Sequence, residues 1–373
     1  MSEHSDLGPS ALSRVLACPG SFMLSQRPEV KALGRRTSFY AARGTVAHRV
    51  AERTLDGQDV TEGVTTQEGH DIDVDDQMVA AVKVYTELVE AFIALADWHV
   101  VEQRVSLDEY WHEAGDVPPV PVFGTTDFAG YHAALRLLRI IDYKHGSGVY
   151  VAVQDNPQAL AYAAGALRLC PGPVNEIEIT IVQPNAAGEP VRSARISIID
   201  LLLWVREVLI PGIARTQSEP DTYVAGSHCR FCPGAVFCPL LAQAASEEAI
   251  MQFGPVSDLA TPEDIARALD QAELAELWIK KVRELAKAAI EVGMEVPDWS
   301  LVPTRPVRSW DDPDEVSRML AAFDDDEVYE FKLRSPTQLQ KRLPGATWKL
   351  LETHIQSTSS GTKLARSSDN ATS

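Results

Sequence analysis

The chain has 373 residues, of which 45% are hydrophobic, and its formal net charge is −19. This length predicts one large domain with an appendage, or two domains. The charge argues against a protein that coats nucleic acid through bulk electrostatic attraction. No apolar run reaches membrane-spanning length, and the N-terminus lacks the apolar segment of a secretory signal. We therefore expect a cytoplasmic protein without a membrane partner.

The N-terminal part of the chain is expected to be helical. A short helix is predicted around Ser10–Leu16, ending at the CPG sequence that begins at Cys18. Residues 37–55 are typical of a second helix, and apolar residues at helical spacing predict a third over residues 74–97. The polar, glycine-rich residues 56–72 are expected to form a loop.

The pattern changes to strands at Trp98. The stretches WHVVEQRVSL, VFGTTDFAGYH and LRLLRIIDYK predict three strands, the last two joined by a short turn. A helix is expected from Asn156, where Asn-Pro provides a start signal, then a fourth strand from Glu176 and a helix over residues 199–210. This order predicts an α/β fold in which helices flank a mixed sheet.

The C-terminal part is expected to be mainly helical. The sequence TPED from Thr261 offers an N-cap threonine, a proline at the first helical position and acids in the first turn, and predicts a helix that runs to Gly293. Two shorter helices are expected near residues 313–323 and 336–343. We predict a domain over residues 1–245, a helical module over 246–356 and a disordered, Ser/Thr-rich tail over 357–373.

An acid and an amine end the third predicted strand. Asp142 and Lys144 are two positions apart, so their side chains point to the same face. An ion pair at a sheet edge is the ordinary interpretation. The second strand, however, contains Asp127, and a hairpin would bring it near Asp142. A divalent Mg²⁺ or Mn²⁺ ion would relieve the repulsion between the carboxylates, and Lys144 could then orient or deprotonate a water for phosphodiester hydrolysis.

Four short motifs follow one another along residues 10–240. They are G-x-x-x-H ending at His48, G-x-x-D ending at Asp127, I-I-D-x-K ending at Lys144, and Q-x-x-x-Y over Gln158 and Tyr162. Taken singly, each has a structural explanation, such as a core histidine or a polar stripe on a helix. In this order they resemble the RecB-type branch of the PD-(D/E)XK nuclease superfamily, with its restriction-endonuclease-like fold.

The resemblance implies a role for each matching residue. Lys144 would be the catalytic lysine, while Gln158 and Tyr162 would contact DNA or brace the site. Glu102, on the first predicted strand, is a weaker candidate for a further acid. The implied metal ligands are His48, Asp127, Asp142 and the backbone carbonyl of Tyr143.

Three of the five cysteines lie within ten residues, as Cys229-x₂-Cys232-x₅-Cys238. This spacing predicts a metal site, and both zinc and an iron–sulfur cluster accept thiolates. Together with the distant Cys18, the set resembles the iron–sulfur staple of a RecB-type subset that includes the AddB nuclease and CRISPR adaptation nucleases. The resemblance implies a [4Fe–4S] cluster held by these four cysteines. Cys170 lies outside the pattern and is expected to be a bystander.

The function implied is that of a metal-dependent DNA exonuclease. It would process DNA ends for recombination or repair, in the host cytoplasm if a phage encodes it, with a single-strand annealing protein or another recombination protein as partner. The alternatives are a DNA-binding or assembly module that cuts poorly and a zinc-stapled phosphodiesterase. A local basic path could offset the acidic net charge, or the same side chains could simply be solvated; they are Arg35, Arg36, Arg43 and Arg49.

Overall fold

The computed structural model describes residues 5–32, 38–58, 63–246, 261–301, 348–349 and 351. The chain divides into one unit over Met1–Leu301 and a second over Val302–Ser373, and the elements below belong to the first. The short helices expected near 313–323 and 336–343, and the tail from residue 357, lie outside the described residues. No helix in the described ranges is both long enough and apolar enough to span a membrane.

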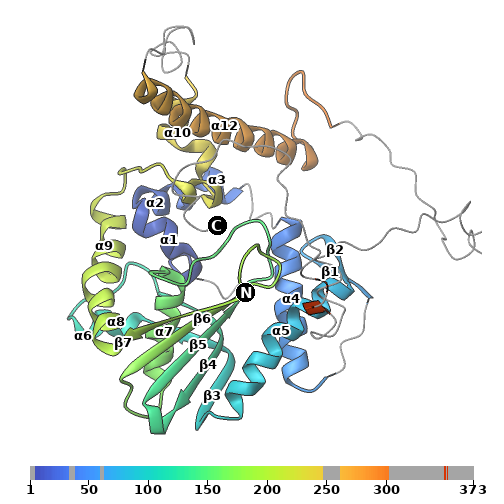
Figure 1. Cartoon of the computed structure of the whole chain (residues 1–373). Helices are drawn as coiled ribbons and strands as arrows, with labels where there is room; N and C mark the ends of the chain where they lie inside the picture. The colour runs from blue at the N-terminus through green and yellow to red at the C-terminus, as the bar shows by residue number, and fades with distance from the viewer. Residues whose placement is uncertain are drawn as a thin grey trace, which may run out of the picture. The chain divides into compact units, whose positions relative to one another are not determined.

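A five-stranded mixed sheet lies at the centre of the first unit, in the order β3-β4-β5-β6-β7 (Figure 1). Strands β5 and β6 are parallel, and the other neighbouring pairs are antiparallel. The predicted α/β fold with a mixed sheet flanked by helices is therefore confirmed. The strands are β3 (Trp98–Ser106), β4 (Phe123–His132), β5 (Leu137–Tyr143), β6 (Glu176–Val182) and β7 (Val191–Ser197).

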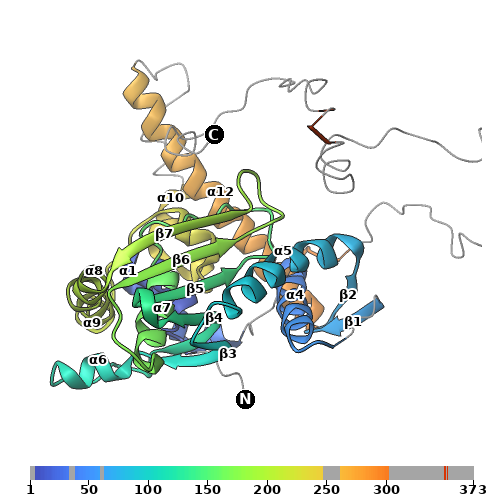
Figure 2. The ribbon, with the colours of Figure 1, turned by 60° about the horizontal axis from the view of Figure 1, so that its bottom comes forward.

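Helices cover both faces of this sheet (Figure 2). Along β5, Leu138 and Ile140 pack in a cluster with α1, α7 and α9, whereas Ile141 and Tyr143 pack in a second cluster with α4 and α5. This alternation follows the two-residue period of a strand, and burial of both faces explains why β5 is almost continuously apolar. The helices named here are α1 (Pro9–Ala17), α4 (Phe39–Leu55), α5 (Asp76–Ile93), α7 (Pro157–Leu169) and α9 (Ile210–Ser218).

Two helices, α7 and the long helix α12, begin at the caps that their sequences predict. The Asn156 side chain accepts hydrogen bonds at the start of α7, and Thr261 and Asp264 form a capping box at the start of α12, as their sequences predict. Trp278 of α12 donates to the Val236 carbonyl at 3.3 Å, which places this helix against the cysteine-rich segment. The further elements are α2 (Gly20–Gln26), α3 (Pro28–Ala32), β1 (Gly63–Gln67), β2 (His70–Val74), α6 (Asp108–Glu113), η1 (Ala133–Leu135), α8 (Ile198–Trp204), η2 (Val205–Leu209), η3 (Ser227–Phe231), η4 (Ala235–Phe237), α10 (Pro239–Ala244) and α12 (Pro262–Glu291).

Three details of the predicted secondary structure were wrong. The loop expected over residues 56–72 contains most of an antiparallel hairpin, β1–β2, whose strands pair with each other and pack on α4. Strand β7, which pairs with β6, was missed because its sequence, VRSARIS, is largely polar. The helix expected to end at residue 210 continues through a π-helical turn, η2, into α9.

Gly165 marks a close approach between α7 and β3. A Cβ atom placed at Gly165 would lie 2.7 Å from the Cβ and Cγ2 atoms of Val105, which is 1% exposed. We expect Gly165→Ala to lower the free energy of unfolding by about 1–3 kcal/mol, because overpacking outweighs the helix propensity of alanine. Adding Val105→Ala should recover part of that loss, as measured by urea denaturation in a double-mutant cycle. If the losses in free energy of unfolding of the two single variants simply added in the double variant, contact with Val105 would not be what limits the approach of α7 to β3.

Candidate functional site

The two central strands part at the predicted acids. The ladder between β4 and β5 ends at Phe128 opposite Ile141, so the next positions in register are Asp127 and Asp142. Beyond that point β4 stays paired with β3, and β5 stays paired with β6. The two carboxylates lie where the strands separate and are 7% and 3% exposed, respectively. The hairpin expected from the sequence therefore brings the two acids to one place.

A possible metal site lies at this point. His48 Nδ1 is 3.5 Å from Asp127 Oδ1 and 3.7 Å from Glu102 Oε1. One ligand atom from each of the three residues lies within 4.8 Å of the others. The side chains of His48 and Glu102 are 33% and 26% exposed, so an ion could enter from solvent. One imidazole and two carboxylates are a suitable ligand set for a divalent cation such as Mn²⁺.

The backbone at Glu102 adopts a conformation that is unusual in a strand. Its φ is 46°, in the left-handed region, although the residues on either side of it are paired with β4. A residue other than glycine in this region costs about 1–3 kcal/mol, and such strain clusters at functional sites. The strained residue sits opposite Asp127, so the strain coincides with the possible metal site.

Burial and neighbouring charges shift the pKa values of His48 and Asp127. Burial lowers the pKa of His48, but the negative charges of Asp127 and Glu102 outweigh it and raise that pKa to about 9. Burial raises the pKa of Asp127 to about 7, opposed by the charge of His48 and reinforced by that of Asp142. Negative charge at the site thus favours the protonated form of His48, and burial favours the protonated form of Asp127. A divalent cation would take the place of such protons.

Lys144 and its neighbours form a polar row beside the acids. Lys144 Nζ lies 2.8 Å from Asp142 Oδ2 and donates to Gln158 Oε1 at 3.1 Å. Gln158 Nε2 in turn donates to the Tyr162 hydroxyl at 3.2 Å. The expected ion pair between Asp142 and Lys144 is therefore present. The structure also brings the predicted residues of β5 and α7 into one row, with Asp142 paired to Lys144 rather than to His48.

The glycine of the G-x-x-D motif lets helices close over β4. A Cβ atom at Gly124 would lie 2.8 Å from Pro9 Cδ and 3.3 Å from Tyr162 Cε1. Any larger side chain would push α1 and α7 away from the strand. The small residue therefore helps to hold Tyr162 near the acids.

Tyr143 and His145 support the site in a way that the sequence did not reveal. The Tyr143 amide donates to Asp127 Oδ2 at 2.6 Å, and its ring centroid lies 5.3 Å from that of His48. Burial lowers the pKa of His145 to about 4, with a further contribution from the charge of Arg43. The ring of His145 is therefore neutral at pH 7, and its Nδ1 lies within hydrogen-bond distance, 2.9 Å, of the Tyr143 hydroxyl oxygen. The signal in the sequence is only that His145 directly follows Lys144.

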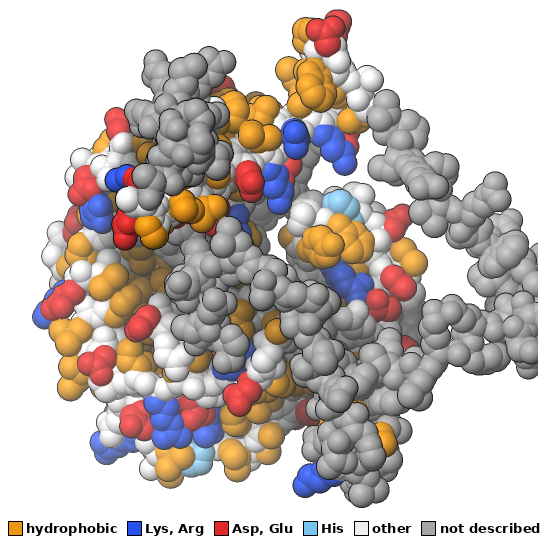
Figure 3. Space-filling model, turned by 45° about the horizontal axis from the view of Figure 1, so that its top comes forward, with side chains coloured by type: hydrophobic (Ala, Val, Ile, Leu, Met, Phe, Trp, Pro, Cys, Tyr) orange, Lys and Arg blue, Asp and Glu red, His pale blue; other side chains and the backbone are white. Residues whose placement is uncertain are grey.

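Of the two described arginines expected in the basic path around His48, Arg43 is paired with an acid and Arg49 with a neutral side chain. Arg43 Nη2 donates to both carboxylate oxygens of Asp75, at 2.7 and 2.8 Å, so its charge is neutralised within the protein. Arg49 donates to Gln67 Oε1 at 2.7 Å. Arg35 and Arg36 lie outside the described residues. On the face shown in Figure 3, acidic and basic side chains are interspersed among the residues that the structure describes.

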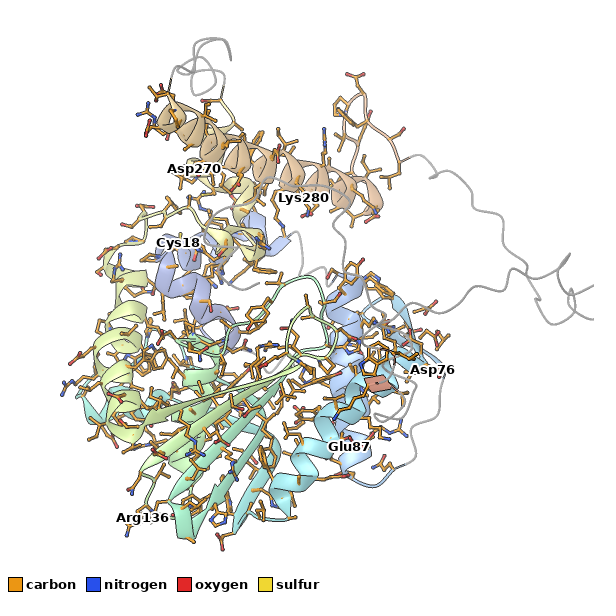
Figure 4. The ribbon with its side chains drawn as sticks, viewed as in Figure 1. Cys18, Asp76, Glu87, Arg136, Asp270 and Lys280 are labelled. Atoms are coloured by element: carbon orange, nitrogen blue, oxygen red, sulfur yellow. The ribbon has the colours of Figure 1, made fainter. Side chains whose placement is uncertain are left out.

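The four predicted cysteines line one cavity. They are free thiols with 5–8% exposure and come from the turn between α1 and α2 and from the segment that runs from η3 to α10. Cys18, labelled in Figure 4, accepts a hydrogen bond from the Val224 amide at 3.4 Å and so meets the distant segment. Cys170 lies elsewhere, near the Gly172 carbonyl. The cavity is lined by Cys18, Cys229, Cys232 and Cys238, with Ser21, Leu24, Tyr223, Val224, His228, Ala235 and Leu241.

His228 also lines this cavity and was missed. Hydrogen bonds to Cys18 and then Cys229 are the largest causes that raise the pKa of His228 to about 10. Its Nε2 lies 3.0 Å from the Val224 carbonyl, which fixes the ring. His228 directly precedes Cys229 in the sequence, and this adjacency could have indicated that it lies at the cysteine cavity.

Among solved structures, the chain is similar to one described as "Crystal structure of SSO0001", at 10% sequence identity and a TM-score of 0.35. The match covers 64% of this chain and 89% of that one. Similarity at this level supports no conclusion about fold or function. The sequence of residues 4–372 matches the family described as "Protein of unknown function (DUF2800)". The chain thus belongs to the DUF2800 family.

Proposed function

We propose that the protein is a metal-dependent deoxyribonuclease with a PD-(D/E)XK fold of the RecB type. The observation that carries this proposal is the position of the Asp142–Lys144 pair beside the group formed by His48, Glu102 and Asp127. Hydrolysis of a phosphodiester needs a cation for the phosphate and a group that positions the attacking water. The site offers a place for each, at the point where the central strands part.

The side chains around the site have distinct roles in this proposal. A bound Mg²⁺ or Mn²⁺ ion would supply charge to the phosphate and lower the pKa of water. His48, Glu102 and Asp127 would hold it, and the resemblance adds Asp142 and the Tyr143 carbonyl. Lys144 would orient the water. Its amine is held by Asp142, by Gln158 and, through Gln158, by Tyr162.

Phosphates away from the site need further positive charge. Lys280, Arg283 and Lys287 line an open hollow along α12, together with Glu276, Ile279 and Glu284. Side chains of this kind contact the sugar–phosphate backbone without reading sequence.

The sequence resemblance is the basis for the proposed biological setting. That setting is action at DNA ends in recombination or repair, a phage origin and a single-strand annealing protein as partner.

We also propose that the four cysteines hold a [4Fe–4S] cluster. A single zinc ion with bonds of about 2.3 Å would bring four sulfurs to about 3.8 Å from one another. In the described residues, no three of the cysteine sulfurs lie mutually within 4.8 Å. Four thiols lining one cavity are a ligand set that a [4Fe–4S] cluster accepts. The cluster would join the α1–α2 turn to the segment before α10, and its role would be structural.

The two alternative functions explain fewer features of the acidic site and of the cysteine cavity. A module that binds DNA and cuts poorly has no need of Asp127, Asp142 and Lys144 within one buried group. A zinc-stapled phosphodiesterase would need closer cysteine sulfurs. We therefore retain the nuclease as the proposed function.

Single substitutions should separate metal binding from cleavage. Lys144→Ala should still bind Mn²⁺ and DNA but cut about 10²–10⁴-fold more slowly, because the group that positions the water is lost. Asp127→Ala should lose Mn²⁺ binding and cleavage together. End-labelled single- and double-stranded DNA would report cutting, and calorimetry would report Mn²⁺ affinity. Lys83→Ala, at a 70% exposed lysine on α5, is the control and should behave as wild type. Cutting by Lys144→Ala at the wild-type rate would refute the catalytic role.

The cluster can be tested by analysis of metal content. Anaerobically purified protein should be brown and contain iron and acid-labile sulfide. Cys238→Ser should lose both and unfold at a lower temperature, because the connection between Cys18 and the C-terminal segment is broken. Cys170→Ser, outside the cavity, should keep the colour and the iron. Colourless protein with one zinc per chain would rule out the iron–sulfur cluster.

A further inference from the structure

The loop over residues 145–155 leaves the sheet at the candidate site. It joins β5 to α7, and the residues flanking it include Lys144 and Gln158, which are bonded to each other. The Lys144 amide donates to the Val182 carbonyl at 2.8 Å, so the loop starts beside the end of β6. The loop therefore begins and ends beside the candidate site.

Two buried polar side chains fix the backbone of this loop. Gln183, which is 1% exposed, donates to the carbonyls of Gly146 and Val149 at 2.9 and 2.7 Å and accepts from the Val151 amide at 3.1 Å. Arg192, which is 8% exposed, donates to the Val151 carbonyl at 3.0 Å and to Gln183 Oε1 at 2.9 Å. These bonds tie the loop backbone to Gln183 and to Arg192 of β7.

The same arginine lies beneath an exposed aromatic ring. Arg192 Cζ is 4.4 Å from the centroid of the Tyr150 ring. The hydrogen bonds recorded for Arg192 in the described residues are to backbone carbonyls and Gln183, and its buried Nε has no partner among them. Tyr150 remains 43% exposed, and Val149 beside it is 41% exposed. The loop thus presents an aromatic surface backed by a positive charge that no carboxylate in these contacts neutralises.

An unpaired nucleic-acid base suits an exposed aromatic ring beside a positive charge. Base–aromatic stacking is worth about 1–3 kcal/mol per base and tolerates any sequence. A cation beneath an aromatic ring is itself stabilised by that ring and attracts a nearby phosphate. The bases of a duplex already stack on one another, so only a single strand or a frayed end can offer a free face.

We infer that Tyr150 is a stacking platform for an unpaired base next to the phosphate that is cut. The inference rests on the proposed nuclease function and deepens it, because it names a single-stranded segment as the substrate at the site. Arg192, beneath the Tyr150 ring, is paired with Ile181 of β6, and Ile181 is paired with Asp142 of β5. Two strand spacings are about 10 Å, so the stacked base would belong to a nucleotide near the cleaved bond. The ring, and not the hydroxyl, would make the contact.

The test compares single strands with and without bases. All proteins carry Lys144→Ala so that the DNA stays intact, and binding of a fluorescent twelve-nucleotide strand is measured with Mn²⁺. Adding Tyr150→Leu should weaken binding roughly 5- to 100-fold, whereas Tyr150→Phe should stay within about twofold. Binding to a blunt duplex should not change. Leu135→Ala removes a 59% exposed side chain at the β4–β5 turn, the end of the sheet marked by Arg136 in Figure 4, and serves as the control.

A scan with single abasic nucleotides locates the contact. At one or two positions, loss of the base should weaken binding to the protein with Tyr150 but not weaken it further in Tyr150→Leu. Unchanged binding by Tyr150→Leu would overturn the inference, as would an equal loss on duplex and on every abasic strand. If wild-type protein cuts DNA while Tyr150→Leu binds normally, only this inference fails. If wild-type protein neither binds nor cuts DNA, the proposed function fails as well.

Discussion

Electrostatic repulsion among buried carboxylates at the parting of β4 and β5 is the constraint that organises this structure. Asp127 and Asp142 are almost fully buried, and Glu102 approaches from the neighbouring strand. Positive charge is therefore needed from both sides of the sheet. His48 supplies it from α4, and Lys144 supplies it from the end of β5. Burying these carboxylates costs free energy of folding, and a bound cation would reduce that cost.

Other elements of the first unit hold the side chains around the place where β4 and β5 separate. Helix α1 connects the two candidate sites, because Pro9 packs over Gly124 of β4 at one end and Cys18 follows the other end. A change in the cysteine cavity could therefore shift α1 and, through Gly124, the position of Tyr162. This physical connection gives the proposed cluster a structural role without any part in the chemistry.

Much of the candidate site could be predicted from local sequence. The two-residue spacing of Asp142 and Lys144, the Asn156 cap and the pairing of strands into a hairpin each depend on nearby residues, and each is present. Other features could not be predicted because nothing in their local sequence identifies the contact. The left-handed backbone of Glu102, the bond between Tyr143 and His145, and strand β7 are examples. Arg43 was expected in a basic path because nothing nearby in sequence identifies Asp75 as its partner.

We propose that the acids where β4 and β5 separate form a metal centre. The most direct measurement is the anomalous diffraction of crystals grown with Mn²⁺, recorded at the manganese absorption edge. The account predicts a peak within bonding distance of His48, Glu102 and Asp127, with Lys144 outside the coordination sphere. A structure of the Mn²⁺-loaded protein with no peak there, and with His48 still paired to Asp127, would contradict it.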